Sequence, residues 1–508
     1  MLRKIRLIAA IVFFTLITLL FLDFTGTIHG WFGWMAKIQF LPAVLALNVG
    51  VVLFLVLLTV IFGRIYCSVI CPMGVFQDLV AWISKQRKSK KKLPYTYSPA
   101  ISWLRYGVLA LFVLAIITGI GSLVALLAPY SSYGRIASNL FQPLWMWGNN
   151  LLAYLAERAD NYLVYETEVW IKGLPTFIIA IVTFIVICVL AWKNGRTYCN
   201  TICPVGTVLG LISRYSLYRI TMDPEKCNQC SLCSRNCKAA CIDFKNHKVD
   251  NSRCVACMNC LSKCKRNAIT FKPVWGKKAA VATLRDTSKP TDASRRRVLS
   301  AALLVTTTHL LKAQNRRPGE EVIMKKDGGL EPIKERKERM RETTMVPSGA
   351  LSIKNLTSHC TACQLCISVC PNHVLKPSGN LMTLMQPEMG YERGFCRPEC
   401  TKCSSVCPTG AIHPITKEEK TTIQIGHAVW EKDCCIVNSD NVECGNCARH
   451  CPTGSIQMVP KDPNDPKSLK IPIVNEETCI GCGACEHLCP SRPYVAIHVV
   501  GHERHRSI

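Results

Sequence analysis

The sequence predicts a multidomain chain: an α-helical membrane domain with four spans and a possible fifth, followed by two small α+β domains built around cysteine quartets. Three observations predict it. Four apolar runs are each long enough to cross a bilayer. The dodecapeptide "GRIYCSVICPMG" (63–74) ends the second run and returns after the fourth as "GRTYCNTICPVG" (195–206). Most of the 31 cysteines among the 508 residues form tight clusters farther along.

The four apolar runs define the membrane domain, residues 1–215. They cover Leu7–Phe24, Leu41–Phe62, Tyr106–Ala128 and Leu174–Trp192. The apolar core of a bilayer is about 30 Å thick and needs roughly 20 helical residues. The first run carries Asp23 near its end, and no small-residue cleavage site follows it. We therefore expect a span there and not a cleaved signal.

Lysine and arginine residues predict the orientation of these spans, because cytoplasmic loops carry an excess of them. Basic residues precede the first run and follow the second and fourth: Arg3, Lys4, Arg6; Lys85, Arg87, Lys88, Lys90, Lys91, Lys92; Lys193, Arg196. The loop between the third and fourth runs instead holds Glu157, Asp160, Glu166 and Glu168. The amino terminus and both dodecapeptides are therefore expected on the cytoplasmic side.

Each dodecapeptide follows two spans, which predicts a duplicated two-helix unit whose halves are related by an axis along the membrane normal. That symmetry would bring four thiols face to face: Cys67, Cys71, Cys199 and Cys203. Four thiolates suffice for one metal ion or one cluster. The alternative interpretation is a thiol-rich packing motif beside the helix ends.

Residues 216–275 carry two quartets with the C-x2-C-x2-C-x3-C rhythm of bacterial two-cluster ferredoxins, in which the fourth cysteine ligates the other cluster. One [4Fe–4S] centre is therefore assigned to Cys227, Cys230, Cys233 and Cys264. The other is assigned to Cys254, Cys257, Cys260 and Cys237. Zinc also binds C-x2-C pairs, but two full quartets in this rhythm make zinc the weaker interpretation.

Residues 351–508 carry four more quartets, which bring the predicted total to six [4Fe–4S] clusters. They are Cys360, Cys363, Cys366, Cys370; Cys396, Cys400, Cys403, Cys407; Cys435, Cys444, Cys447, Cys451; and Cys479, Cys482, Cys485, Cys489. Cys434 is an alternative to Cys435. We expect the first and last quartets to exchange their fourth cysteines, and the middle two to do likewise. Cys489 would then join the first quartet, Cys451 the second, Cys407 the third and Cys370 the last.

Two cysteines, Cys188 and Cys241, fall outside every motif and are expected to be structural or bystander residues. Disulfides are a weak alternative for the clustered cysteines, because the spacings are those of iron–sulfur ligands. The net charge of +27 raises the question of nucleic acid as a partner. The basic residues largely flank apolar segments and cluster motifs, and no nucleic-acid motif is present, so none is expected.

Residues 276–350 link the two cysteine-rich domains. Within them "SRRRVLSAALLVTTTHLL" (294–311) sets three arginines before a weakly apolar run. The stretch 294–313 is a basic linker with a surface helix, a fifth span, or a twin-arginine export signal, which we favour. Export would place the last domain in the periplasm, while the first cysteine-rich domain stays cytoplasmic at a bacterial inner membrane.

These motifs resemble two known families joined end to end. Residues 1–275 resemble the NapH-type membrane ferredoxin of periplasmic nitrate reductase systems, with four spans, two CxxxCP motifs and two cubanes. Residues 294–508 resemble the MauM/NapG-type four-cluster ferredoxin, which begins with a twin-arginine signal. The membrane half is also similar to the NosR and CcoG families. The resemblance implies a quinol dehydrogenase that draws on the quinone pool and passes electrons to a periplasmic reductase or cytochrome.

Three functions compete on this evidence. The first is a quinol-oxidising electron conduit, with Asp23, His29 and the aromatic stretch 139–150 as a candidate quinol pocket; an interfacial aromatic belt is the alternative for that stretch. The second is a CcoG-like metal reductase that handles copper at the CxxxCP cysteines. The third is a non-catalytic electron-transfer subunit of a larger membrane complex, which holds clusters but no substrate site. A cytosolic donor that feeds the first two clusters is the alternative to quinol as the source of electrons.

Overall fold

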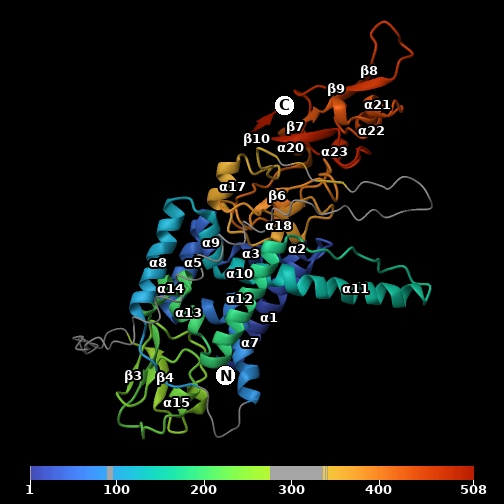
Figure 1. Ribbon diagram of the computed structural model, residues 1–508. Helices are drawn as coiled ribbons and strands as arrows, with labels where there is room; N and C mark the ends of the chain where they lie inside the picture. Colours follow the sequence, from blue (N-terminus) through green and yellow to red (C-terminus); the bar gives the residue numbers. More distant parts are fainter. Residues whose placement is uncertain (1, 88–94, 275–335, 338, 340) are drawn as a thin grey trace, which may run out of the picture.

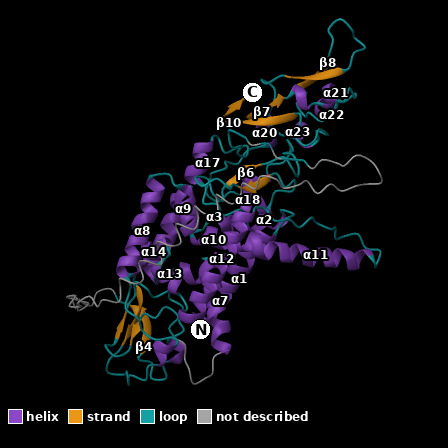
Figure 2. Cartoon of the chain, viewed as in Figure 1, coloured by secondary structure: helices purple, strands orange, loops and turns teal. Residues whose placement is uncertain are grey.

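The computed structural model describes residues 2–87, 95–274, 336–337, 339 and 341–508. Three bodies follow one another along the molecule: a helical domain in the middle, a small domain with β1 to β4 at one end, and a larger cysteine-rich domain at the other (Figure 1). Among the described residues, strands occur only in the two end domains (Figure 2). The candidate export segment 294–313 lies outside the described residues.

Two helices of the central domain have the length and composition to cross a membrane: α1 (Leu2–Leu22) and α12 (Leu174–Asn194). At 1.5 Å per residue, each is about 31 Å long, which matches the apolar core of a bilayer. Three shorter apolar helices accompany them: α5 (Val49–Phe62), α8 (Ser102–Ile117) and α14 (Pro204–Ser213). The remaining helices of this domain are α2 (Thr27–Phe32), α3 (Trp34–Lys37), α4 (Phe40–Leu45), α6 (Tyr66–Val69), α7 (Pro72–Arg87), α9 (Gly121–Leu127), α10 (Pro129–Ile136), the π-helix η1 (Ala137–Phe141), α11 (Gln142–Glu157) and α13 (Thr197–Thr201).

Each of the two middle apolar runs, which the sequence predicts as spans, is divided into two shorter helices. The run from Leu41 to Phe62 divides into α4 and α5 because Leu47 takes a left-handed φ of 52°, after which the Asn48 side chain caps α5. The run from Tyr106 to Ala128 divides into α8 and α9 at Gly119, whose φ is 73°. Four membrane spans therefore stay a prediction.

The duplicated unit predicted from the repeat is visible in the packing of the helices. Helix α7, which follows the first dodecapeptide, packs against α12, which precedes the second. In the same way α14, which follows the second dodecapeptide, packs against α5, which precedes the first. Helix α1 packs on α6 and α7, as α8 packs on α13 and α14. The two halves thus interlock, and the two motifs lie at their common centre.

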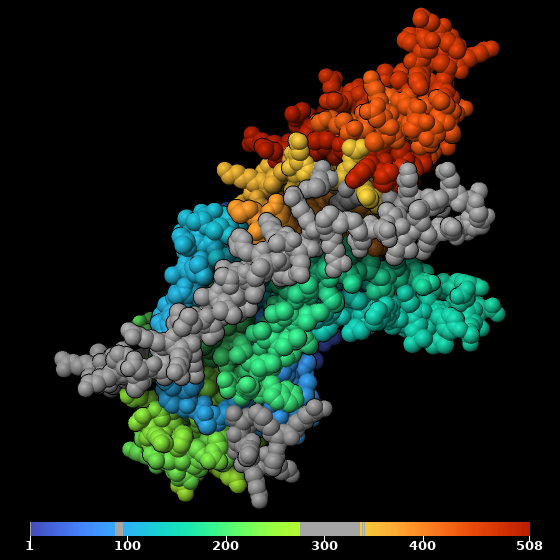
Figure 3. Space-filling model, viewed as in Figure 1, coloured from blue at the N-terminus to red at the C-terminus, as the bar shows by residue number. Residues whose placement is uncertain are grey.

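Between the halves, α10 and η1 are buried, whereas α11 leaves the bundle. All eight residues of α10 are buried, and this helix packs on α7 and α12. Helix α11 projects sideways from the helical domain (Figures 1 and 3). It exposes large apolar side chains, among them Leu144, Trp145, Trp147 and Leu151. The stretch 139–150 thus has exposed apolar side chains on α11, and both a quinol pocket and an interfacial aromatic belt stay predictions for it.

The small domain is closed by β1 (Tyr218–Met222) and β4 (Ile269–Pro273), which pair antiparallel with Ile220 opposite Phe271. The first and last strands therefore bracket both quartets of residues 227–264. Its other elements are α15 (Leu232–Arg235), β2 (Ile242–Asp243), β3 (Lys248–Val249) and the 3-10 turn η2 (Leu261–Lys263). This is the compact α+β arrangement expected of a two-cluster ferredoxin.

The large domain contains two cysteine-rich cores. Its elements are α17 (Ile353–His359), α18 (Leu365–Ser368), β5 (Leu375–Pro377), β6 (Pro387–Met389), α19 (Lys402–Val406), α20 (Lys417–Thr422), β7 (Ile423–Trp430), η4 (Lys432–Cys434), α21 (Ile436–Ser439), α22 (Asn446–Arg449), β8 (Ile456–Pro460), β9 (Lys470–Val474), α23 (Ala484–His487) and β10 (Ile497–Ser507). Strand β7 pairs with β10 and encloses the last two quartets, as β1 and β4 do in the small domain. The first two quartets lie in a different core, which the large domain shares with the helical domain.

The two end domains sit at opposite ends of both long helices. At the start of α1, Arg3 donates to the hydroxyl of Ser262 at 3.2 Å; beyond its other end, Thr25 accepts from Lys402 at 2.9 Å. After α12, the Arg196 amide donates to the Lys238 carbonyl at 2.9 Å. Before α12, Gly173 packs against Pro377. The small domain and the large domain are therefore separated by roughly the length of a membrane-crossing helix.

Candidate iron–sulfur centres

The small domain groups its cysteines as the motif predicts. One cavity of about 200 Å³ is lined by the first three cysteines of the first quartet and the fourth of the second: Cys227, Cys230, Cys233 and Cys264. In the second group, burial raises the pKa of Cys260, and the thiols of Cys257, Cys254 and Cys237 raise it further. The geometry thus provides the two cross-linked ligand sets, while cluster binding by these residues stays a prediction.

Cys241 lies closer to a cluster site than its isolated position in the sequence indicates. Its sulfur is 3.5 Å from that of Cys237, and it also hydrogen-bonds Cys254. It is a neighbour of the second group and not a fifth member of a motif. Cys188 is half-buried in α12, away from every quartet, which agrees with a structural role.

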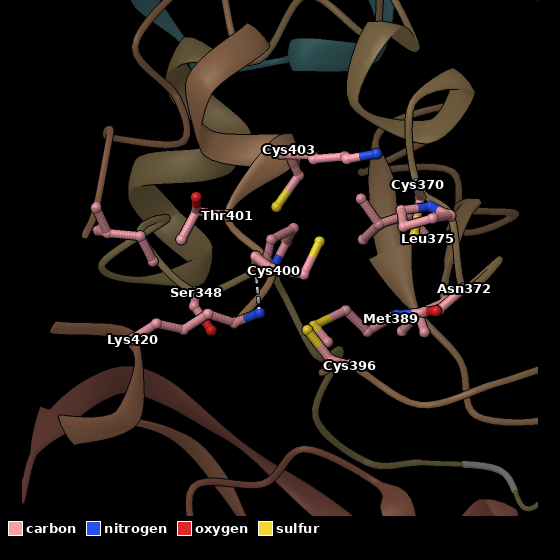
Figure 4. A pocket seen from close by; sticks show the side chains of 15 residues that line it. Ser348, Cys370, Asn372, Leu375, Met389, Cys396, Cys400, Thr401, Cys403 and Lys420 are labelled. Carbon is pink, nitrogen blue, oxygen red and sulfur yellow. Dashed lines mark hydrogen bonds between the residues drawn. The ribbon is translucent and has the colours of Figure 1, made fainter. Parts of the chain in front are cut away.

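The pairing expected for the large domain is wrong, because consecutive quartets exchange their fourth cysteines. Figure 4 shows Cys370, the last of the first quartet, facing one pocket with Cys396, Cys400 and Cys403. Conversely, burial raises the pKa of Cys366, and the thiols of Cys363, Cys360 and Cys407 add to it. Cys407 therefore completes the first quartet and Cys370 the second.

The last two quartets are related in the same way. A second pocket is lined by Cys435, Cys444, Cys447 and the distant Cys489. Burial raises the pKa of Cys485, and the thiols of Cys482, Cys479 and Cys451 raise it further. Cys451 thus joins the fourth quartet, and neither Cys407 nor Cys370 crosses between the cores. The cause is the β7–β10 pairing, which closes the last two quartets into one unit.

The structure also separates Cys435 from Cys434. Cys435 is buried and lines the pocket of the third quartet. The sulfur of Cys434 instead accepts a hydrogen bond from Arg339 at 3.3 Å. Cys435 is therefore the member of the quartet.

No group of three Cys, His, Asp or Glu side chains in the described part of the chain is close enough to hold a single metal ion. The four thiolates of a [4Fe–4S] cubane bind four different iron atoms, so their sulfurs lie farther apart than the ligands of one ion. Every described cysteine is a free thiol. The quartets therefore fit cubanes by residue type, number and grouping.

The dodecapeptide cysteines converge at the centre of the helical domain. Cys67, Cys71, Cys199 and Cys203 are each 3–4 % exposed. Burial raises the pKa of Cys203 well above its usual value, and the thiols of Cys199, Cys71 and Cys67 add to that effect. The symmetry argument from the repeat thus places the four thiols together, as expected.

The arginines of the two dodecapeptides cross over between the repeats. Arg64 donates to the carbonyl of Cys199 at 3.1 Å, and Arg196 donates to the carbonyl of Cys67 at 2.6 Å. The glycines of the motif make room for them. A Cβ at Gly74 would lie 2.8 Å from a guanidinium nitrogen of Arg196, and one at Gly206 would lie 2.8 Å from Arg64.

A buried carboxylate joins the second arginine to the rest of the protein. Asp78 accepts from Arg196 at 2.7 Å and from Arg6 at 2.5 Å, and Lys238 lies 3.3 Å away. Burial would raise the pKa of Asp78, but Arg196, Lys238 and Arg6 hold it well below its usual value. Asp78 is therefore ionised and ties the first helix, both repeats and the small domain together.

Asp23 and His29, the candidate quinol residues, form a buried dyad beside the large domain. Their side chains are 2 % and 6 % exposed, and the His29 Nδ1 lies 3.1 Å from the Asp23 carboxylate. The carboxylate also accepts the backbone amides of Thr25, Gly26 and Ile28. Because the carboxylate accepts, the ring donates from Nδ1. Its Nε2 has no hydrogen-bond partner in the described structure.

Three basic residues lie beside the cysteines of the large domain, and none of them was singled out in the sequence: Arg135 and Lys420 are buried, and Lys172 is half-buried. Burial lowers the pKa of Lys172 to about 7, although the nearby thiols of Cys366 and Cys370 favour its charged form. Burial likewise lowers the pKa of Arg135 to about 10. Lys420 donates to the carbonyls of Arg397 and Cys400. These residues, like Asp78, are isolated in the sequence, so no spacing signal could have revealed them.

Comparison with protein families gives matches to the cysteine-bearing segments. Residues 44–91 and 176–220, which contain the two dodecapeptides, match a model described as a 4Fe–4S binding domain. Residues 441–492 and 250–374 match two models of 4Fe–4S dicluster domains. The match over 250–374 joins quartets that the structure places at opposite ends of the helical domain. It therefore reflects the shared cysteine rhythm and not one folded unit.

Several curated proteins are similar to parts of the chain. The methylamine utilization ferredoxin-type protein MauM of Methylobacillus flagellatus is 33 % identical over 29 % of this chain and 64 % of its own length. The ferredoxin-type protein NapH of Haemophilus influenzae is 28 % identical over 39 % and 56 %. The putative electron transport protein YccM of Escherichia coli is 21 % identical over 39 % and 47 %. No solved structure matches significantly.

This chain thus spans about half to two thirds of the length of these relatives. The matches and the cysteine groups together identify an iron–sulfur electron-transfer protein of ferredoxin type with several [4Fe–4S] clusters. The two long apolar helices and the similarity to NapH indicate that it associates with a membrane.

Proposed function

We propose that the protein, which would carry six [4Fe–4S] clusters, oxidises quinol at the membrane and passes the electrons through the clusters of the large domain to a periplasmic reductase or cytochrome. The observation that carries this proposal is the Asp23–His29 dyad, whose free ring nitrogen lies at the end of α1 that adjoins the large domain. A bacterial inner membrane is the proposed location, with the small domain in the cytoplasm and the large domain in the periplasm.

The dyad has the geometry of a proton acceptor. Quinol oxidation releases two electrons and two protons. With Nδ1 donating to Asp23, the lone pair on His29 Nε2 is free to take a proton from a quinol hydroxyl, and Asp23 stabilises the resulting imidazolium. His29 releases that proton before it accepts the second. Because Asp23 is held by backbone amides, the ring keeps its orientation throughout the cycle.

The same dyad lies next to a candidate electron acceptor. Lys402 donates to the carbonyl of Thr25, two residues from Asp23, and the next residue is Cys403 of the second quartet. A bound cubane accepts one electron at a time, so two or more of them divide the pair that quinol gives up. The buried cations Arg135 and Lys420 favour the reduced, more negative state of the adjacent sites.

The test uses the purified full chain with its clusters and a water-soluble menaquinol analogue. We expect quinol to bleach the cluster absorbance, and His29→Gln to slow that bleaching by about 100-fold, the usual contribution of a positioned general base. His413→Gln, which changes an exposed histidine of the large domain, is the matched control. Reduction by dithionite should stay the same in all three proteins.

Asp23→Asn separates positioning from simple loss of structure. It should slow bleaching by quinol and shift its pH dependence, with the iron content unchanged. If quinol bleaches no cluster while a reduced cytosolic ferredoxin does, the quinol hypothesis fails, and the protein is an electron-transfer subunit without a quinol site. Reduction of added copper that is abolished in Cys67→Ala would instead support the metal reductase.

A further inference from the structure

We infer that Cys67, Cys71, Cys199 and Cys203 hold a seventh redox centre, an iron–sulfur cluster bound by four thiolates, which relays electrons through the helical domain between the small and the large domain. The inference rests on the iron–sulfur character of the chain and on the position of this quartet. It does not depend on oxidation of quinol by the dyad.

On one side, the quartet adjoins the second cluster site of the small domain. The Arg196 amide donates to Lys238, and Asn200 donates to the carbonyl of Ala239 at 3.2 Å; these residues directly follow Cys237. Arg64 donates to the carbonyl of Ser252 at 3.1 Å, two residues before Cys254. Cys237 and Cys254 belong to the same group, so both dodecapeptides touch the loops that hold this one site.

On the other side, a short chain of buried residues leads to the large domain. The hydroxyl of Tyr198, next to Cys199, donates to the carbonyl of Leu127 at 3.4 Å. Arg135, fully buried on α10, lies within electrostatic reach of both Tyr198 and Cys363. The neighbouring Gly134 packs against the backbone of Cys363: a Cβ added at Gly134 would lie 2.5 Å from the Cys363 carbonyl oxygen. The buried helix α10 thus separates the quartet from the first site of the large domain.

The quartet therefore divides the span of the helical domain into two shorter steps. Electron tunnelling falls steeply with distance, and the long helices that separate the end domains measure about 31 Å. Without a carrier between them, the clusters of the small domain would be isolated from those of the large domain. With a carrier at this quartet, an electron leaves a reduced cluster on one side of the helical domain and arrives at an oxidised cluster on the other side. No proton is released or taken up.

The charges around the quartet call for an anion. Arg64 is fully buried, and its recorded acceptors are neutral oxygens of Asn200, Ser252 and Cys199, with the sulfur of Cys67 3.9 Å away. Its Nε and the Nη2 of Arg196 have no partner in the described structure. A buried cation without a counterion is costly. A cubane bound by four thiolates has a net negative charge and would balance it.

Further donors already point at the sulfurs. Gln77 donates to the sulfur of Cys199, and the Gly206 amide donates to that of Cys203, both at 3.3 Å. Such hydrogen bonds stabilise thiolates and set the potential of a bound cluster. A thiol-rich packing motif would need neither the donors nor the arginines.

The first test counts iron and unpaired spins in the purified full chain. We expect about 28 irons per chain, from seven cubanes, and about 24 in Cys67→Ala and in Cys203→Ala. Cys188→Ala changes a cysteine outside every quartet and should keep the full content. The two quartet variants should also lose one and the same paramagnetic signal from the dithionite-reduced protein. A content of about 24 in the unchanged protein, together with unaltered spectra of both variants, would overturn the inference.

The second test measures the relay in sealed proteoliposomes that carry the full chain and trapped ferricyanide. A reduced ferredoxin added outside should reduce the trapped ferricyanide through the unchanged protein and through Cys188→Ala. In Cys67→Ala this rate should fall at least tenfold, while menaquinol still bleaches the clusters of the large domain. An unchanged rate would refute the relay. Loss of bleaching by quinol alone would count against the proposed function only.

A third variant distinguishes an effect on the cluster from misfolding of the protein. Arg64→Gln keeps all four cysteines and the shape of the site but removes the cation. We expect it to keep its iron and to change the spectrum and potential of a single centre. If Arg64→Gln keeps its iron and every centre behaves as in the unchanged protein, then the arginine does not face a cluster, and the assignment of this quartet is wrong.

Discussion

Arg64 of the first dodecapeptide donates a hydrogen bond to the backbone carbonyl of Cys199 in the second, at 3.1 Å. The reverse contact, from Arg196 to the carbonyl of Cys67, is also present. Neither half of the helical domain can therefore form its cysteine site alone. The GRxYCxxxCPxG motif is half of an interlocking structure, in which arginine, glycine and cysteine each contribute to the partner half.

The motif glycines should be intolerant of a methyl group. A Cβ at Gly74 would lie 2.2 Å from the carbonyl oxygen of Cys67, and one at Gly206 would lie 2.3 Å from that of Cys199. We expect Gly74→Ala and Gly206→Ala each to destabilise the fold by about 3 kcal/mol, because the backbone must shift to relieve the overlap. The measurement is the unfolding midpoint in detergent at one scan rate.

Gly107 provides the control for this prediction. It lies in α8, and a Cβ there would meet nothing within 4 Å. Gly107→Ala should be neutral or stabilising by up to about 1 kcal/mol, because alanine is the better helix former. Equal midpoints for Gly74→Ala and Gly107→Ala would contradict the crossed packing.

Non-additive iron loss should reveal the pairing of the quartets. If Cys370 and Cys396 serve one cluster, the double variant Cys370→Ala/Cys396→Ala loses about four irons, as does each single variant. Cys370→Ala combined with Cys360→Ala should lose about eight, because the two residues then serve different clusters. Iron analysis of the purified proteins therefore shows which quartets share a cluster. A loss of eight irons in the first double variant would restore a pairing between the first and last quartets.

The choice between adjacent cysteines can be tested in the same way. Cys435→Ala should lose one cluster, because Cys435 lines the pocket with Cys444, Cys447 and Cys489. Cys434→Ala should keep all clusters, since its sulfur faces Arg339. Both variants change neighbouring residues of the same loop, so each is the control for the other. Equal iron content in the two would contradict the assignment.

His505 on β10 should make the large domain less stable in mild acid. Burial, with a contribution from His502, lowers the pKa of His505 from 6.5 to about 4. Between these values the unfolded chain binds more protons than the folded one. The stability from His505 is therefore complete above pH 6.5 and is lost as the pH falls toward 4. At about 1.4 kcal/mol per pKa unit, the upper limit of this loss is about 3 kcal/mol.

His505→Gln should reduce this dependence. We expect the difference in unfolding midpoint between pH 7 and pH 5 to be smaller in His505→Gln than in the unchanged protein. His413→Gln, at an exposed position, should leave the difference as it was. A pH dependence identical in all three proteins would show that His505 does not contribute.

The cysteine rhythm alone determined the membership of every quartet in the small domain. The fourth cysteine of each quartet lies four positions after the third, on the following helical turn, from which it reaches the neighbouring site. The local spacing is enough to set this position. For the large domain the same rule left the partner open, because four quartets can be paired in more than one way. The pairing of β7 with β10 decided it by closing the last two quartets into one unit.

The apolar runs predicted helices correctly, but they did not predict where two of those helices break. Long apolar runs predicted α1 and α12, because hydropathy and length suffice for a continuous helix. The breaks at Leu47 and Gly119 have only weak local signals, because an asparagine cap and a single glycine permit a break in an apolar run without requiring one.

The sequence by itself thus determined which residues carry the chemistry: the cysteines, their rhythm and the duplication of the dodecapeptide. Only the tertiary structure decided which of them meet and what surrounds them. The buried cations, Asp78 and the free nitrogen of His29 come from residues far apart in the chain. Burial turns these ordinary side chains into determinants of charge and proton transfer, and burial is a property of the folded chain as a whole.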